Sequence, residues 1–571
     1  MSPAKSRITR RRFLKTAAMA AAGTMAAACG AEPEPAAAPA EEAEPVAAAE
    51  EAPESMCEMD WDPTLPPFEK YDPEVVIMVE DTGQTYVEGD TYDNNPMYNL
   101  RRDLMGIRFE AHWTAAGDAR AAKRAADIAA GTLADYFVCN TVEAAEFIAN
   151  GAAEEIREVV DATYSPLSKQ VMHYPDGESW APATRGDKLY GFPEEGSPAG
   201  GNNLCWIRQD WLDTVGLGIP TTVAELEETM RAFVDAGLSK FGIGANKMLI
   251  IWAASMDAIF GAHGVMPKTW RDYGDGTLTY GSIRPENREV LALLQTWYKD
   301  GLIHPDFYTF GPGDSFSQFT SQEVGVYWGA YWLLGRMQAV EAENPGAKWT
   351  YFSRLEGPDG KLGRRGGNAS GRVYCFRKGI ERRKVEAVFK YLNWNNELWF
   401  NFPEYQVYQW SAGTGIWKEG YDWVWDENCE LQEGPHYSRN TGSGHWIQGI
   451  LSNEGTAAYW DNIEPWILET DRSKLNKAQR LIADPAQKPA MDVYRAVYNT
   501  QHECMLNQFL GAPGPKMVDF TGNLTALEDA AYLEIISDAR PLDAFDQFVD
   551  NWKKSGGDEV TAEVNEWYAS V

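Results

Sequence analysis

A regular alternation of short apolar runs with amphipathic stretches constrains the fold of this chain more than any other feature. The first run covers residues 75–79 and is followed by a helical pattern at 97–105. Two further runs, at 106–110 and 135–140, are each followed by another helical stretch. Unbroken apolar strands are typical of a parallel sheet that helices cover on both faces. The order predicts an α/β fold with right-handed crossovers.

The same alternation continues after a hairpin-like segment at residues 188–193. Apolar runs recur at 203–207, 323–328 and 371–376, and amphipathic stretches lie between them. Thr222 and Glu225 are spaced as a capping box that starts one of these helices. The last hundred residues have mainly helical patterns, and no repeat of 20–50 residues is visible. A second lobe of α/β type is therefore expected.

The first thirty residues have the pattern of an export signal. Arg10, Arg11 and Arg12 match the twin-arginine pattern, and an Ala-rich apolar run follows at 16–28. This run is too short to span a membrane, and small residues precede Cys29 as in a lipoprotein processing site. We expect lipidation of Cys29. The alternative is cleavage by an ordinary signal peptidase, because Ala26 stands where a large aliphatic residue is more usual.

Residues 29–70 are expected to form a disordered acidic tether. Within them, residues 31–60 repeat Ala, Glu and Pro and contain ten acidic residues and no Lys or Arg. Such a segment cannot bury enough apolar surface to offset the entropy of ordering it. A flexible arm after a lipidated cysteine would hold a folded domain outside the membrane. A disordered N-terminus without a role is the alternative.

The charge balance argues against two classes of binding partner, nucleic acids and anionic lipid surfaces. The chain has 51 Lys and Arg against 84 Asp and Glu, a formal net charge of −33. This excess repels phosphate backbones, so we expect no binding of nucleic acid. It also argues against docking on anionic lipids through a basic surface, so the lipid anchor is the expected membrane contact. No other stretch is apolar for long enough to predict a membrane-spanning helix.

Four motifs in order along the chain resemble those of one family. They are the hairpin at 188–193, the "RQDWLDTVGL" stretch that begins at Arg208, the helix end at 297–306, and a closing pattern at 545–568. This combination resembles the extracellular solute-binding protein family 1 of ABC importers, the maltose-binding-like group in its longer lipoprotein branch. The resemblance implies a monomer that grips a saccharide and delivers it to an ABC permease.

The resemblance also implies a domain plan. It is the two-lobe periplasmic-binding-protein fold, an α/β architecture with a cleft between lobes joined by crossing strands. We expect a signal peptide at 1–28, the tether at 29–70, lobe 1 at 71–192 and 349–394, and lobe 2 at 193–348 and 395–571. The protein is expected on the outer face of the cytoplasmic membrane or in the periplasm.

A cleft for sugars needs flat aromatic rings and planar polar groups, because sugars present C–H faces and hydroxyl rims. The chain has 22 Trp, and several follow predicted strands, where α/β clefts form. Core packing is the alternative for each, and Trp252, in an apolar run, is as readily a core residue. The candidate ligand contacts are Trp113, Asn140, Thr141, Glu194, Asn203, Trp328, Tyr331, Trp332 and Trp410. Arg208, Lys247 and Arg336 are the cations that could meet an acidic sugar.

Motifs of catalysis and of metal binding are missing from the sequence. There is no G-x-S-x-G, H-E-x-x-H or phosphate-binding loop, so no catalytic residue, cofactor or metal is expected. Some relatives carry an acidic calcium loop, but residues 235–241 offer one carboxylate. A secreted glycoside hydrolase or lyase is the alternative function, because carboxylate pairs cannot be excluded in so acidic a chain. An adhesion lipoprotein is a further alternative.

The lipid anchor predicts a specific effect of Cys29→Ser. This change removes the thiol to which lipid would be attached, so we expect the protein to move from the membrane fraction to the soluble fraction of the cells that produce it. The measurement is fractionation followed by mass spectrometry of the mature N-terminus. Unchanged processing and membrane association would contradict lipidation.

Overall fold

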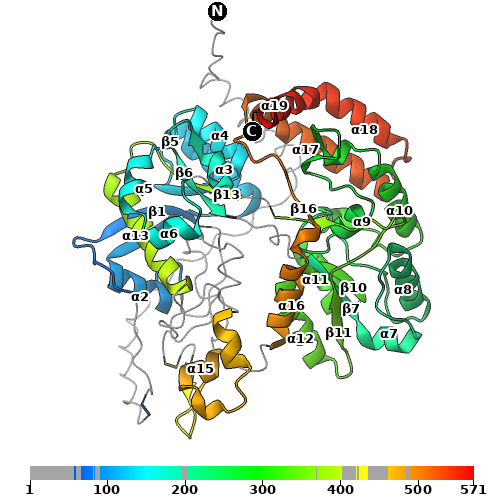
Figure 1. The fold of residues 1–571 in the computed structure, drawn as a ribbon, viewed down its shortest axis with the longest axis horizontal. Helices are drawn as coiled ribbons and strands as arrows, with labels where there is room; N and C mark the ends of the chain where they lie inside the picture. Colours follow the sequence, from blue (N-terminus) through cyan, green and yellow to red (C-terminus); the bar gives the residue numbers. More distant parts are fainter. Residues whose placement is uncertain are drawn as a thin grey trace, which may run out of the picture.

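The computed structural model describes residues 57–58, 66–81, 83, 90–175, 177–195, 203–367, 370–400, 419–420, 423–434, 461–483 and 488–570. Two lobes of mixed helix and sheet lie side by side in Figure 1, each with its own sheet and its own core. No helix within the described residues is both long and apolar enough to cross a membrane.

Lobe 1 is built on a five-stranded sheet in the order β2-β1-β3-β13-β6. β1, β2 and β3 are parallel, whereas β13 is antiparallel to both of its neighbours. The strands are β1 (Val75–Asp81), β2 (Ile107–Thr114), β3 (Tyr136–Cys139), β6 (Gly191–Glu195) and β13 (Ser370–Phe376). The helices are α2 (Pro96–Met105), α3 (Gly117–Ala130), α4 (Thr141–Ala149), α5 (Arg157–Thr163), α6 (Pro166–Val171) and α13 (Arg382–Phe400), with a short 3-10 turn, η1, at Glu178–Ala183.

Local chemistry explains where the elements of lobe 1 begin and end. α4 starts in a capping box, in which the Asn140 side chain accepts from the backbone N–H groups of Val142 and Glu143 and the Glu143 carboxylate accepts from the Asn140 N–H. α2 ends at Gly106, whose φ is +65°, and a Cβ there would lie 2.2 Å from the Tyr71 carbonyl oxygen. Only glycine fits this turn between α2 and β2.

Lobe 2 surrounds a three-stranded antiparallel sheet in the order β10-β7-β11. Its strands are β7 (Asn203–Arg208), β10 (Val326–Ala330) and β11 (Trp349–Phe352), and a hairpin is formed by β8 (Trp270–Asp272) and β9 (Leu278–Tyr280). Its helices are α7 (Gln209–Val215), α8 (Val223–Asp235), α9 (Asp257–Ala262), α10 (Asn287–Lys299), α11 (Pro312–Thr320), η5 (Tyr331–Leu333), α12 (Leu334–Glu343), α16 (Lys488–Asn499), α17 (Pro515–Ile536), α18 (Ala544–Trp552) and α19 (Asp558–Tyr568).

The C-terminal helices complete the core of lobe 2. Phe545, Phe548 and Trp552 of α18 are 4% exposed or less, and they belong to the cluster that contains Ile207 of β7 and Trp328 of β10. Their spacing of three and four residues puts one face of α18 on α17 and on the hairpin. The spacing of these residues in the sequence is that of a helix with one buried face.

The chain returns from lobe 2 to lobe 1 at a later residue than the expected domain plan predicts. Residues 349–352 form β11, which pairs with β7 in lobe 2, and Arg364–Arg365 form β12, which pairs with β16 (Cys504–Met505). Pairing with the sheet of lobe 1 starts at Ser370. The expected start of this segment at residue 349 is therefore wrong, because the run at 349–352 completes the second sheet first.

A third, small cluster lies below the two lobes in Figure 1. It contains β14 (Trp423–Trp425), β15 (Leu431–Glu433) and α15 (Lys477–Ile482), and Tyr331 of lobe 2 and Phe400 of lobe 1 pack against it. A disulfide joins Cys57, within the segment expected to be a disordered tether, to Cys429 in this cluster. The disulfide ties together two segments separated by 372 positions in the sequence.

One buried arginine joins three segments near the crossing strands. The Arg364 guanidinium is 1% exposed and donates to the Asn203 carbonyl oxygen at 3.1 Å and to the Val497 carbonyl oxygen at 2.8 Å. It also donates to Thr500 Oγ1 at 3.0 Å. Arg364 thereby fixes β12 to the start of β7 and to the end of α16.

We expect replacement of Arg364 to cause a large loss of stability. In Arg364→Met, the buried Asn203 and Val497 carbonyl oxygens lose their donor, and we expect the free energy of unfolding to fall by about 3 kcal/mol. Urea denaturation monitored by Trp fluorescence measures it. Arg354→Met is the control, because that guanidinium is exposed and its pair with Glu503 is worth at most about 1 kcal/mol. Equal losses in both variants would contradict the role of Arg364.

Candidate functional site

Polar side chains and one tryptophan lie at the carboxyl edge of the sheet in lobe 1. β2, β3 and β6 end there at Thr114, Cys139 and Glu195. The register of β13 brings its first residues to the same edge, with Arg372 opposite Glu194 and Val373 opposite Cys139. Ligands of open α/β sheets bind outside such edges.

One end of the sheet in lobe 2 lies beside the point where the chain enters this lobe from lobe 1. Ala330, the last residue of β10, pairs with Asn203, the first residue of β7 after the chain crosses from lobe 1. The Ala330 N–H donates to the Trp252 carbonyl oxygen at 2.9 Å, so the loop before α9 is fixed beside the end of β10. Trp332 follows two residues later in η5.

Three aromatic rings form a row at this edge of lobe 2. The Trp252 ring centroid lies 4.9 Å from that of Trp332 and 5.6 Å from that of Phe316. Trp332 is 47% exposed and Trp252 is 40% exposed, although large apolar side chains are usually covered. We call Trp332, Trp252 and Phe316 the aromatic row. Exposed, supported indole faces of this kind can stack on the C–H face of a sugar.

Trp252 was expected to be as readily a core residue as a ligand contact, and the structure explains why the pattern was ambiguous. The stretch from Leu249 to Met256 is apolar, but it forms a loop of bends in which Leu249 and Ala254 have positive φ. Asn246 holds the loop from within, because its Nδ2 donates to the Ala253 carbonyl oxygen at 2.8 Å. The loop turns Trp252 outward, which no periodic pattern could indicate.

The predicted contacts in lobe 2 separate into three kinds. Trp332 is exposed and lies in the aromatic row. Tyr331 is half-buried against Tyr494, with ring centroids 5.3 Å apart, and burial raises its pKa to about 12. Trp328 is 1% exposed and packs on Phe352 in the core, so its prediction as a stacking residue is wrong. Its side chain points from β10 into the core of lobe 2.

Asn203 is also a framework residue rather than an open ligand contact. Its side chain is 1% exposed, and Nδ2 donates to the Ile251 carbonyl oxygen at 2.9 Å and to Asp257 Oδ1 at 3.2 Å. Asn203 therefore fixes the loop that carries Trp252. Its prediction as a residue that touches ligand is wrong, because its side chain is enclosed by that loop and by α9.

In lobe 1, the predicted contacts lie at the carboxyl edge of the sheet, but several of their polar groups already bind other residues of the protein. The Trp113 indole N–H donates to Asp127 at 2.6 Å, and its ring is half-buried. Asn140 is exposed, but its oxygen caps α4. The Glu194 carboxylate lies 3.4 Å from the Arg372 guanidinium, and burial raises its pKa while Arg372 lowers it. Cys29 and Trp410 lie outside the described residues.

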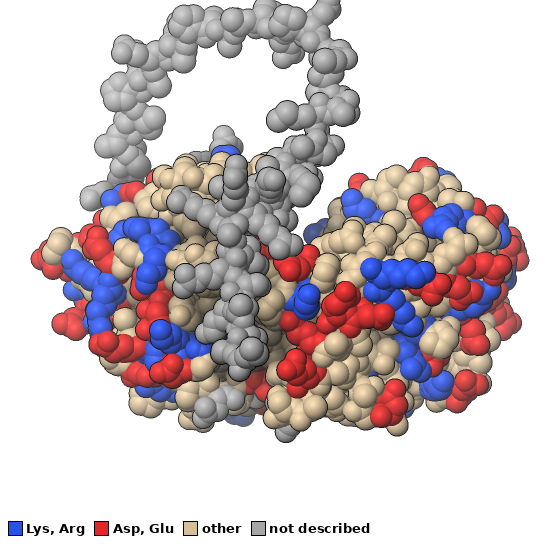
Figure 2. Space-filling view, turned by 90° about the horizontal axis from the view of Figure 1, so that it is seen from above, with Lys and Arg blue, Asp and Glu red and all other residues tan. Residues whose placement is uncertain are grey.

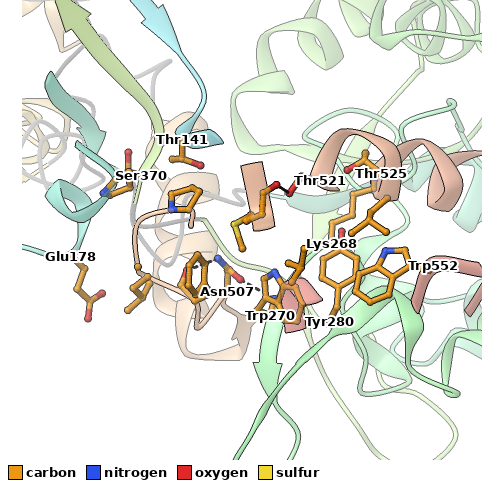
Figure 3. A pocket seen from close by; sticks show the side chains of 18 residues that line it. Thr141, Glu178, Lys268, Trp270, Tyr280, Ser370, Asn507, Thr521, Thr525 and Trp552 are labelled. Atoms are coloured by element: carbon orange, nitrogen blue, oxygen red, sulfur yellow. Dashed lines mark hydrogen bonds between the residues drawn. The ribbon is translucent and has the colours of Figure 1, made fainter. Parts of the chain in front are cut away.

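Thr141 lines a pocket of about 200 Å³ between the lobes. In Figure 3, Thr141, Ser370 and Glu178 of lobe 1 face Lys268, Trp270 and Tyr280 of lobe 2. Most of the other lining residues come from the C-terminal segment, namely Asn507, Phe509, Leu510, Gly511, Pro513, Met517, Thr521, Leu524, Thr525, Trp552 and Val560. The pocket therefore lies between the two lobes, beside the contact between α4 and α17.

A family model described as bacterial extracellular solute-binding protein matches residues 106–394. The chain belongs to this family. The match spans both edges described above, from β2 through the aromatic row to α13.

Curated relatives and solved structures agree with this assignment. The polygalacturonan/rhamnogalacturonan-binding protein YtcQ of Bacillus subtilis (strain 168) is 23% identical over 66% of this chain and 70% of its own. Lipoprotein LipO of the same organism is 23% identical over 64% of this chain and 68% of its own. The alginate-binding protein AlgQ2 superposes with a TM-score of 0.62 at 14% identity, and FusA of S. pneumoniae with 0.59 at 15%. The alignments cover 87% of this chain and 99% of each of these two structures, which shares the two-lobe fold.

A buried carboxylate next to the pocket predicts a specific pH dependence. Glu528 of α17 is 1% exposed and accepts from Tyr280 Oη at 3.0 Å and from Ser282 Oγ at 2.7 Å. Burial raises its pKa to about 7. Because the folded state then binds the proton more tightly than the unfolded chain, this group favours folding at low pH, and its contribution is lost as pH rises toward and through 7.

The test compares the wild-type protein with Glu528→Gln at pH 5 and pH 8. We expect the stability of the wild type relative to the variant to fall by about 3 kcal/mol between the two pH values. Urea denaturation at each pH measures the difference, and groups that titrate in both proteins cancel. Parallel pH profiles of the two proteins would contradict a raised pKa for Glu528.

Proposed function

We propose that the protein captures a saccharide between its lobes and delivers it to the permease of an ABC importer. The observation that carries this proposal is the exposed pair Trp252 and Trp332 at the end of β10, beside the point where the chain enters lobe 2. An indole face that covers a sugar ring removes apolar area from water at about 25 cal/mol per Å². The saccharide-binding relatives named above support the same ligand class.

The polar groups of lobe 1 supply the second half of the site. Trp113, Asn140, Thr141 and Glu194 lie at the carboxyl edge of the sheet in lobe 1 and would contact hydroxyl groups or the second face of the ligand. Such hydrogen bonds orient the ligand more than they add net affinity, because each replaces a bond to water. A ligand that touches both lobes binds the closed arrangement more tightly than an open one and so drives closure.

The mature protein would work outside the cytoplasmic membrane. A twin-arginine signal at 1–28, lipid on Cys29 and the acidic tether would hold a monomer near its permease, and the relative named as a lipoprotein supports the anchor. The family and its relatives are described as binding proteins, and this favours capture without catalysis over the alternative of a glycoside hydrolase. Delivery needs no bond to be made or broken.

The aromatic row predicts which substitutions weaken binding. We expect Trp252→Ala and Trp332→Ala each to reduce the affinity for the best saccharide from a thermal-shift screen by about 2 kcal/mol, because each loses a stacking face. Titration calorimetry measures the affinity. Tyr308→Ala is the matched control, because Tyr308 is a 42% exposed aromatic residue of the same lobe. Trp328→Ala should instead destabilise the fold by about 3–5 kcal/mol.

Wild-type affinity in both Trp252→Ala and Trp332→Ala would place the site elsewhere. Failure of every saccharide to stabilise the protein in the screen would refute the ligand class. A bound ligand at 100 times its dissociation constant stabilises a protein by about 2.7 kcal/mol, which such a screen detects readily.

A further inference from the structure

Arg336 differs from every other arginine side chain that the structure describes. Among the described residues its guanidinium has no hydrogen-bond or ion-pair partner, and it lies over the face of Phe316, with the guanidinium carbon 4.3 Å from the ring centroid. The other described arginines are engaged, as when Arg208 forms two bonds to Asp210 and Arg231 contacts Glu227 and Asp300. An exposed guanidinium without a partner is notable in a chain of net charge −33.

The position of Arg336 extends the aromatic row. Phe316, on which the guanidinium lies, is the third ring of the row, next to Trp252. Arg336 also follows Trp332 by four residues, where η5 continues into α12, so both side chains leave the helix on one side. Two exposed indoles and an unpaired cation are thus held on one surface. Stacking on Phe316 restricts the guanidinium and leaves its N–H edge open.

A planar guanidinium with a free edge binds a carboxylate through two parallel hydrogen bonds. Neutral sugars offer hydroxyl groups, and a hydrogen bond from an exposed guanidinium to a hydroxyl replaces a bond to water and so adds little net affinity. We propose that the saccharide bound at the aromatic row is acidic, and that Arg336 binds the carboxylate of a uronic acid unit while Trp252 and Trp332 stack on sugar faces. This inference rests on the proposed function and names the substrate class of the same site.

The charges of the facing lobe are compatible with an acidic ligand. Glu194 is the predicted contact of lobe 1 that carries a negative charge, and its carboxylate is paired with Arg372 at 3.4 Å. Acidic and basic side chains are intermixed over much of the face seen in Figure 2, and a group of acidic side chains lies near its centre. Repulsion by distant exposed charges is screened beyond about 8 Å at physiological salt, whereas a direct guanidinium–carboxylate contact persists.

The experiment compares matched acidic and neutral ligands by titration calorimetry at pH 7. The probes are trimers of galacturonate, mannuronate and glucuronate, each set against the neutral trimer of galactose, mannose or glucose with the same linkage. We expect at least one acidic trimer to bind the full mature protein about 10-fold or more tightly than its neutral counterpart. Arg336→Gln should weaken that acidic trimer by about 10–100-fold and leave the neutral one unchanged.

Two controls separate a local contact from overall charge and from folding. Arg288→Gln makes the same change in net charge at a partly exposed arginine of α10, which is paired with Asp543 and Asp546, and it should leave both affinities unchanged. Arg336→Lys keeps the charge but not the planar fork, so it should recover part of the affinity for the acidic trimer. Thermal denaturation should show that Arg336→Gln is as stable as the wild type.

The outcomes distinguish this inference from the proposed function. Tighter binding of neutral than of acidic trimers, or equal effects of Arg336→Gln and Arg288→Gln, overturns the acidic class. If binding of a neutral trimer still requires Trp252 and Trp332, the proposed function stands although the acidic class is overturned. If none of the six trimers binds, the acidic class is overturned, and the wider saccharide screen decides the proposed function by itself.

Discussion

The pairing of β13 with β3 and β6 is the interaction on which the two-lobe arrangement depends. β13 enters the sheet of lobe 1 after the chain has built most of lobe 2, and its residues pair with partners that lie 175 to 240 positions earlier. Its antiparallel register sets Arg372 opposite Glu194. Because strands of lobe 1 are supplied from both sides of lobe 2, neither lobe can be completed without the other.

This interleaving also explains why the candidate site lies where it does. β6 ends at Glu195, and β7 begins at Asn203, so the carboxyl edge of one sheet and the start of the other are joined by a short crossing. Asn203 and Arg364 then fix the Trp252 loop and the end of α16 to that crossing. The aromatic row is therefore supported by the same backbone segment that links the lobes. A change in the angle between lobes would move the row relative to Trp113 and Asn140.

Periodicity predicted the elements of the fold far better than it predicted the residues of the site. The unbroken apolar runs at β1 and β3 and the capping box at α8 were all readable, since burial and capping leave local patterns. The late return to lobe 1 was not readable, because β11 and β13 are both short apolar runs and only tertiary pairing assigns them to different sheets. The disulfide between Cys57 and Cys429 leaves no local pattern either.

Trp328 and Trp332 show where a sequence argument of this kind fails and what the structure adds. They lie four positions apart, yet one is 1% exposed and the other 47%, because β10 ends at Ala330 and the chain turns into η5 between them. Burying the Trp332 ring in the core would have been the more stable arrangement, by about 2 kcal/mol. Two neighbouring indoles are instead left in water, and an unpaired guanidinium lies on the adjoining ring. A ligand that covers these groups explains their exposure better than the stability of the fold does.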